Sequence, residues 1–157
     1  MSGLISVDEA LTHIRTYRPL TKTVNLPLVE TLGLRLAEDI HAKLSQPPAD
    51  VSAMDGYAVR LSDVSQKGTS LSVIGEAPAG TPFQGTFGPG QAVRIFTGGQ
   101  VPAGADHIVI QENVLRSGDE ITLEAAYDTS AHIRTTGRDF RVGDRLIMAN
   151  SLSLIHI

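Results

Sequence analysis

The 157-residue sequence contains no cysteine, which excludes disulfides, thiolate nucleophiles, cysteine-ligated zinc and iron–sulfur clusters. Tryptophan is also absent, and aromatic residues make up only 4% of the chain. The core must therefore be packed mainly by aliphatic side chains. No run of basic residues occurs, and 13 basic against 17 acidic residues give a formal net charge of −4. This balance disfavours a nucleic-acid-binding surface.

Long apolar runs are missing as well. No stretch approaches the roughly 20 residues that a membrane-spanning helix needs. The opening residues 1–9 lack the basic and apolar regions of a secretory signal peptide. The length and the 41% hydrophobic content fit about one globular domain. We therefore expect a soluble cytoplasmic protein that binds neither nucleic acid nor membranes.

An amphipathic helix is predicted at the start of the chain. Ser6 and Glu9 have the spacing of a capping box, in which each side chain satisfies the backbone N–H group of the other residue. Pro19 ends the helical pattern, because the residue before a proline is displaced from helical geometry. We expect residues 1–20 to form this helix. Its apolar stripe consists of Val7, Ala10, Leu11, Ile14 and Tyr17.

The middle of the chain is rich in short runs of β-branched residues separated by glycine and proline. These runs are Tyr57–Val59, Leu71–Ile74, Val93–Phe96, Ile108–Ile110 and Ile121–Leu123. No helical pattern long enough to cover a parallel sheet lies among them. The pattern therefore favours a small β-barrel or sandwich over an alternating β–α sheet.

A proline pair, Pro47-Pro48, marks a domain boundary. We predict a mainly β protein with an N-terminal helix, of the α+β class. Residues 47–127 would form the β module, inserted into an elongated β-rich domain built from residues 21–46 and 128–157. The later extended runs are expected to pair with the strands before Pro47. The runs outside the module are Thr23–Leu26, 34–42, Ala131–Arg134 and Asp144–Met148.

Common signatures of catalysis and metal binding are missing from the sequence. Gly99 and Gly104 have the spacing of a phosphate-binding loop, but Ala105-Asp106 stands where such a loop needs Lys-Ser/Thr. No Gly-x-Ser-x-Gly nucleophile motif occurs. The histidines are scattered without ligand spacing, so a structural role is favoured for His13, His41, His107, His132 and His156.

Three polar loops remain as candidates for a functional site. In the first, Asp55 precedes Gly56, which permits a close backbone approach and a sharply aimed carboxylate. In the second, Thr97 precedes a glycine pair that can present N–H groups to an anion. In the third, two arginines flank Gly137 and suit phosphate or carboxylate contacts. Each loop taken alone also fits a simple reading as a turn, a hairpin or a solvated strand end.

Taken in order, the three loops resemble the signatures of the molybdopterin molybdenumtransferase family. The run 47–59, which contains Ser-Ala-Met-Asp-Gly-Tyr-Ala, resembles the family hallmark. The segments 95–112 and 133–140 resemble its second and third signatures, and residues 26–40 fit its opening. The resemblance covers residues 4 to 149.

The resemblance implies an activity and a set of site residues. The family transfers molybdenum from molybdate onto adenylylated molybdopterin and releases AMP, with Mg²⁺ assisting. Asp55 and Thr97 match positions implicated in that reaction. Asp55 would act as a metal- or water-positioning carboxylate, and Thr97 with Gly98 as oxyanion donors. The remaining residues implied to bind substrate are Ser52, Gly56, Arg134 and Asp139.

The resemblance also implies an organisation larger than this chain. In the family, a pterin-binding α/β domain follows the segment present here, and we expect residues 1–20 to pack on it. The family forms homodimers and receives its substrate from a molybdopterin-adenylating protein. We expect the chain to be an N-terminal fragment, inactive alone, and residues 151–157 to be an interrupted end. The alternative is a non-catalytic dimerisation or interaction module of the same fold.

Overall fold

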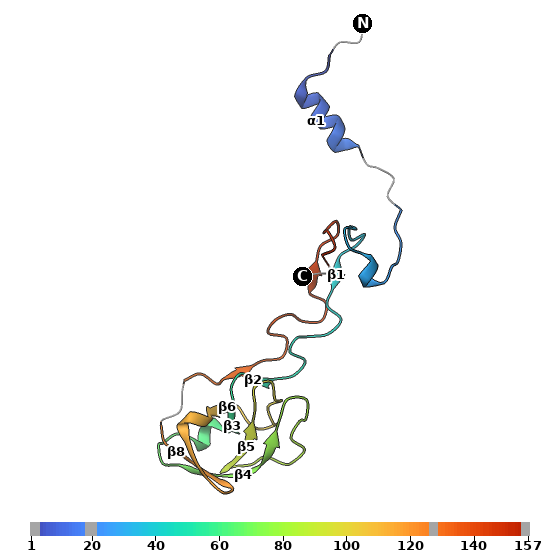
Figure 1. Ribbon diagram of the computed structural model, residues 1–157. Coiled ribbons are helices and arrows are strands. Elements are labelled where there is room, and N and C mark those ends of the chain that lie inside the picture. The colour runs from blue at the N-terminus through green and yellow to red at the C-terminus, as the bar shows by residue number, and fades with distance from the viewer. Residues whose placement is uncertain (1–3, 18–21, 126–128, 155–157) are drawn as a thin grey trace. The chain divides into compact units, whose positions relative to one another are not determined.

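The computed structural model describes residues 4–17, 22–125 and 129–154, and it divides into two compact units (Figure 1). Unit 1 comprises residues 1–40 and 147–157, and unit 2 comprises residues 41–146. The predicted boundaries at residues 20/21 and 127/128 lie outside the described residues, as do residues 155–157 of the predicted interrupted end. The inserted-module organisation therefore stays a prediction.

Helix α1 spans Val7–Thr16 and begins with the predicted capping box. The Ser6 hydroxyl accepts a hydrogen bond from the Glu9 N–H at 3.2 Å, and the Glu9 carboxylate accepts one from the Ser6 N–H at 2.8 Å. None of the described residues of α1 is buried. Its apolar side chains are exposed: Val7, Leu11 and Ile14. The predicted stripe is present, and its packing on a further domain stays a prediction.

Elsewhere in unit 1, two distant segments pair through their backbones. The Leu36 N–H donates to the Ser151 carbonyl at 3.0 Å, and the Ser153 N–H donates to the Leu34 carbonyl at 2.8 Å. A short 3₁₀ turn, η1 (Leu28–Glu30), precedes this pairing. The run Thr23–Leu26, expected to be extended and to pair, forms no strand in the described structure. A strand needs a paired neighbour, and no strand pairing in the described structure includes these residues.

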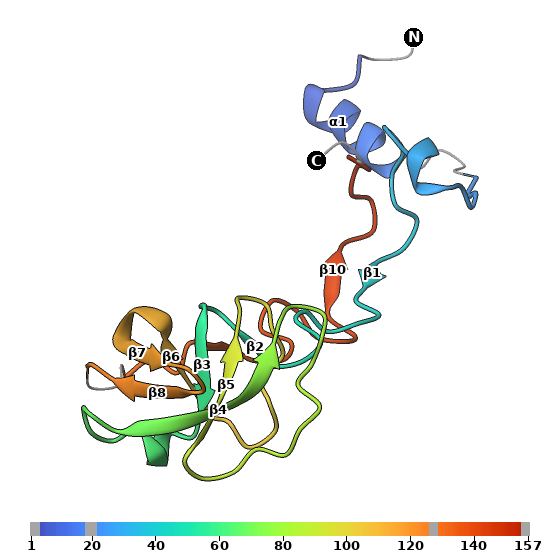
Figure 2. The same ribbon diagram turned by 60° about the horizontal axis from the view of Figure 1, so that its bottom comes forward.

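Unit 2 is built on a six-stranded sheet that curls into half a barrel (Figure 2). The order of strands is β6-β3-β5-β4-β8-β7. The mainly β fold with one N-terminal helix is thereby confirmed. The strands are β3 (Gly56–Val59), β4 (Ser70–Ala77), β5 (Gln91–Ile95), β6 (His107–Ile110), β7 (Val114–Ser117) and β8 (Glu120–Leu123). The 3₁₀ turns η2 (Leu61–Asp63) and η3 (Gln111–Asn113) follow β3 and β6.

One strand pair of this sheet, β4 with β5, is parallel, while its other pairs are antiparallel. A parallel neighbour needs a connection of about a dozen residues rather than a tight turn. Residues 78–90, which are rich in glycine and proline, form a loop that supplies this connection. The crossover is therefore made without the helix that usually accompanies parallel strands.

Strand β3 lies at the centre of the packing. All four of its residues are buried, and alternate side chains enter two different apolar clusters. Tyr57 and Val59 join the cluster that contains Ile121 and Leu123, whereas Ala58 joins the one that contains Ile95. The start of β3, where the first polar loop ends, is consequently held on both faces of the sheet.

Two short two-stranded sheets complete the fold. Strand β1 (Ile40–His41) pairs with β10 (Arg145–Ile147), as predicted for the runs on either side of the module. The expectation for the run at 131–134 was wrong in its partner. Strand β9 (Ile133–Arg134) pairs with β2 (Val51–Ser52), which lies after Pro47 rather than before it. The backbone N–H and C=O groups on one edge of β2 are satisfied by β9, and those of Ser52 on its other edge are satisfied by Gly98 and Gly99.

The close approach at Gly56 yields a test of the sheet. A Cβ atom on Gly56 would lie 2.1 Å from the Val109 carbonyl oxygen in β6, so alanine there must push β3 and β6 apart. We expect Gly56→Ala to lower the free energy of unfolding by about 1–3 kcal/mol in urea denaturation. In the control Gly88→Ala, a Cβ meets only the Gln91 side chain at 3.4 Å. Equal destabilisation of both variants would contradict this close packing.

Candidate functional site

The three polar loops predicted from the sequence meet along the short strand β2. On one edge, the Ser52 N–H donates to the Gly99 carbonyl, and the Gly98 N–H donates to the Ser52 carbonyl, each at 2.9 Å. On the other edge, Val51 pairs with Arg134 and Ser52 with Ile133. The first loop leads directly from Ser52 to Asp55. Strand β2 therefore joins all three loops through backbone hydrogen bonds.

Asp55 and Thr97 form a direct side-chain pair. Oδ1 of Asp55 accepts a hydrogen bond from the Thr97 N–H at 2.8 Å and another from the Thr97 hydroxyl at 2.9 Å. Asp55 precedes β3, and Thr97 follows β5, the strand next to β3 in the sheet. The two residues selected from separate loops thus lie at one end of two adjacent strands.

These hydrogen bonds stabilise the ionised form of the carboxyl. The backbone N–H of Thr97 has the largest effect and lowers the pKa of Asp55 below its ordinary value. The Thr97 hydroxyl lowers that pKa further, and the positive charge of Arg94 adds a smaller lowering. Partial desolvation acts in the opposite direction. Asp55 is therefore a fixed anion at neutral pH.

The predicted oxyanion donors are engaged within the protein. The Thr97 N–H and hydroxyl point at Asp55, and the Gly98 N–H points at the Ser52 carbonyl. Glycine is required here for two reasons. Gly98 has a φ of +82°, and a Cβ on Gly99 would lie 2.3 Å from the Ala77 carbonyl oxygen. In this arrangement the glycine turn fixes the loop, and the group left to face a ligand is Asp55.

Ser52 and Gly56, expected to contact substrate, occupy packed positions. Ser52 is only 1% exposed, and its hydroxyl bonds to the backbone of Met54. Gly56 is buried against Val109 of β6. Both residues hold the Asp55 loop in this structure.

The third loop contains an ion pair and a second aspartate–threonine pair. One terminal nitrogen of Arg134 lies 2.8 Å from each carboxylate oxygen of Asp139. Asp50 Oδ1 accepts hydrogen bonds from the Thr136 N–H at 2.7 Å and from its hydroxyl at 2.8 Å. Among the described residues, no hydrogen bond joins Arg134 or Asp139 to the side chain of Asp55. Arg134 instead pairs with Val51 of β2, and Asp139 is joined to Arg134 by the ion pair.

Two residues of the site were missed by the sequence analysis. Asp50 was quoted within the family hallmark but given no role, and the structure places it against Thr136. Arg94 lies in strand β5, as its run predicts, and it also binds the Gly56 carbonyl next to Asp55 and the ring of Phe96 next to Thr97. The available signal was a lone charged residue inside the apolar run Val93–Phe96.

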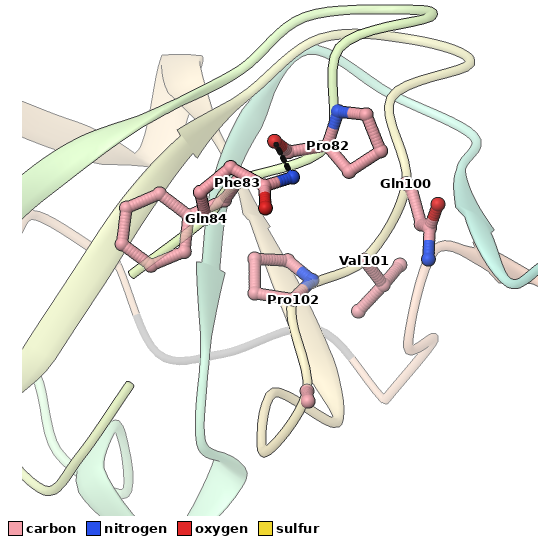
Figure 3. Close-up of a pocket in the computed structure, with 7 residues that line it drawn as sticks. Pro82, Phe83, Gln84, Gln100, Val101 and Pro102 are labelled. Carbon is pink, nitrogen blue, oxygen red and sulfur yellow. Dashed lines mark hydrogen bonds between the residues drawn. The ribbon is translucent and has the colours of Figure 1, made fainter. Parts of the chain in front are cut away.

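Two shallow hollows of about 370 Å³ each lie beside the glycine turn. One is lined by Pro82, Phe83, Gln84, Gln100, Val101, Pro102 and Ala103 (Figure 3). The other is lined by Gly98 and by residues of the segments 46–51 and 80–82. Pro82 and Gln100 border both hollows, and none of the described lining residues is charged. The charged groups of the site therefore lie outside these hollows.

A magnesium ion fits this site only if water, substrate or residues beyond those described supply most of its ligands. Among the described residues, no three His, Cys, Asp or Glu side chains gather into a metal-binding group. Oδ2 of Asp55 makes no hydrogen bond with another described residue, so one carboxylate oxygen is available. Magnesium is commonly held by one or two carboxylates together with water and substrate phosphates. Asp55 suits the role of the single protein carboxylate.

The fold and the joined loops define a β-rich domain with a polar site at its strand ends. A family model described as "MoeA N-terminal region (domain I and II)" matches residues 5–152. The chain therefore belongs to this family, and the resemblance inferred from the three loops is confirmed. None of the helices among the described residues is long and apolar enough to span a membrane.

Individual relatives agree with this assignment. The molybdopterin molybdenumtransferase of Haemophilus influenzae is 41% identical over 143 residues, which are 90% of this chain and 35% of that protein. The Bacillus subtilis protein of the same name is 34% identical over 91% of this chain and 35% of its own. A crystal structure of a molybdopterin biosynthesis moeA protein from Pyrococcus horikoshii matches with a TM-score of 0.73 and 36% identity, covering 79% of this chain and 34% of that one. The chain thus spans about a third of the length of these relatives.

The hydrogen bonds to Asp55 yield a test by titration. We expect the pKa of Asp55 to lie below its ordinary value and to rise partway toward it in Thr97→Val. The rise is incomplete because the backbone N–H, which has the largest effect, remains. A pH titration of the side-chain carboxyl carbon by NMR measures both values. Thr136→Val, which removes the hydroxyl bonded to Asp50, is the matched control and should leave the pKa of Asp55 in place. An unchanged pKa in Thr97→Val would contradict the pairing.

Proposed function

We propose that the chain is the N-terminal part of a molybdopterin molybdenumtransferase. The whole protein would transfer molybdenum from molybdate to adenylylated molybdopterin and release AMP, in the cytoplasm and with Mg²⁺ as cofactor. The family match and the names of the relatives support the enzyme class. The observation that carries the proposal is the ionised Asp55, fixed by Thr97 at the point where three loops meet.

The geometry suggests how these residues serve the reaction. Thr97 holds Oδ1 of Asp55, which keeps the carboxylate ionised and leaves Oδ2 to bind a metal ion or to orient a water molecule. A bound Mg²⁺ would neutralise charge on the phosphate and oxyanion groups of the substrates. Because Oδ1 is held by two bonds, the carboxylate needs little reorganisation when a substrate arrives.

The same loops offer contacts for the rest of the substrate. Arg134 and Asp139 are about two-fifths exposed, so the ion pair can present its edge to a ligand. We propose that this pair borders a cleft completed by a second subunit in a homodimer. The upstream partner would be a molybdopterin-adenylating protein. Because the chain spans about a third of its relatives, we propose that it needs the remaining domains for turnover.

A chimeric enzyme tests this function. Residues 5–152 would replace the matching segment of the Haemophilus influenzae enzyme, and molybdate-dependent AMP release from adenylylated molybdopterin would be measured. We expect the chimera to be active and Asp55→Asn to lower kcat on the order of 100-fold, because the fixed anion is lost. Asp119→Asn makes the same change in the β7–β8 turn and should retain activity.

The outcomes separate the two function classes. An inactive but folded chimera would contradict the enzyme assignment, whereas full activity of Asp55→Asn in an active chimera would contradict the role of Asp55. Full activity together with altered self-association of the variant would instead favour the interaction module. Turnover by the unextended chain would contradict its dependence on further domains.

A further inference from the structure

We propose that Arg94 is the positioning residue that holds Asp55 and Thr97 together, so that its planar guanidinium group, rather than its charge alone, keeps the site assembled. The structural part of this inference stands on the contacts of Arg94. Its kinetic consequence rests on the proposed function.

The guanidinium group of Arg94 is fixed by four contacts. It lies 5.1 Å from the ring centroid of Tyr57 and 4.8 Å from that of Phe96. One terminal nitrogen donates to the Gly56 carbonyl at 3.1 Å, and the other donates to Oε1 of Gln111 at 2.7 Å. A group held by two rings and two acceptors has little freedom to move.

Two of these contacts reach the backbone around Asp55. Gly56 follows Asp55 directly, and the Gln111 N–H donates to the Asp55 carbonyl at 3.1 Å. Arg94 therefore binds the next residue of the loop and also the residue of η3 that holds the Asp55 peptide. If the guanidinium group were removed, both anchors would lose a shared partner.

The position of Arg94 in β5 links these anchors to Thr97. Arg94 pairs with Tyr57 in the sheet, and the neighbouring pair is Ile95 with Gly56. The next residues of β5 lead through Phe96, whose ring also contacts Arg94, to Thr97. The Arg94 side chain thus contacts both β3, which follows the acceptor Asp55, and Phe96, which precedes the donor Thr97.

Lysine cannot reproduce this arrangement. The two terminal nitrogens of arginine point at two acceptors at once, and its flat face stacks on aromatic rings. A lysine ammonium keeps the positive charge near Asp55 but has neither the fork nor the flat face. A positioning role therefore predicts that Arg94→Lys behaves like Arg94→Gln, whereas a purely electrostatic role predicts that lysine restores the site.

NMR of the 157-residue chain tests the structural part. The probe is the backbone amide of Thr97, which donates to Asp55. We expect its resonance to shift, and its hydrogen exchange to accelerate on the order of tenfold, in both Arg94→Gln and Arg94→Lys. Arg116→Gln removes an exposed arginine from β7 and should leave this amide unchanged. An unchanged Thr97 amide in both Arg94 variants, or restoration by lysine, would overturn the proposal.

A milder variant covers the case in which Arg94→Gln does not fold. Gln111→Ala removes one acceptor from Arg94 but retains the backbone N–H that binds the Asp55 carbonyl. We expect the Thr97 amide to shift in the same direction and by a smaller amount. No shift in a folded Gln111→Ala chain would overturn the bracing of Asp55 through Gln111.

Kinetics of the chimera test the functional part. We expect both Arg94 variants to lower kcat on the order of tenfold to 100-fold with little change in KM, because the carboxylate is displaced rather than removed. An unchanged kcat in an active chimera would overturn the kinetic role. If the parent chimera itself is inactive while the Thr97 amide still responds to Arg94, the proposed function fails and the positioning role stands.

Discussion

The pair of hydrogen bonds from Thr97 to Asp55 closes the end of two neighbouring strands and determines what the site can do. Asp55 directly precedes β3, which is buried on both faces, and Thr97 follows the end of β5, so the pair joins the packed sheet to its loops. The neighbouring contacts maintain this arrangement. The glycine turn places Thr97, and strand β2 fixes the turn. Arg94 binds the Gly56 carbonyl and the side chain of Gln111, whose backbone N–H binds the Asp55 carbonyl.

Short-range features of the fold could be predicted from the sequence because their causes are local. The Ser6–Glu9 capping box depends on residues three apart, and the β-branched runs at Tyr57–Val59 and Ile108–Ile110 indicate buried strands wherever they pair. The pairing partners of the strands were harder to predict from the sequence. The pairing of β2 with β9, and the parallel pairing of β4 with β5, depend on contacts between segments far apart in the chain. Periodicity carries no information about such partners.

The site shows the same division. The sequence places Asp55 and Thr97 in separate polar loops, and the resemblance implies a role for each; the structure adds that they bond to each other. The sequence did not indicate that the Thr97 and Gly98 donors turn inward, because that depends on where Asp55 and Ser52 lie. The role of Arg94 in the site could not be predicted from the sequence for a related reason. An arginine in a β-run is commonly a solvated residue, and only the rings of Tyr57 and Phe96 reveal its packed position.

The central claim is that the Thr97 N–H donates to the Asp55 carboxylate. A scalar coupling across this hydrogen bond, between the Thr97 amide nitrogen and the Asp55 carboxyl carbon, measures it most directly in the isotopically labelled chain at neutral pH. We expect a detectable coupling that disappears in Asp55→Ala. The absence of a coupling in the folded protein, under conditions where couplings across the β3–β5 backbone hydrogen bonds are seen, would contradict the account.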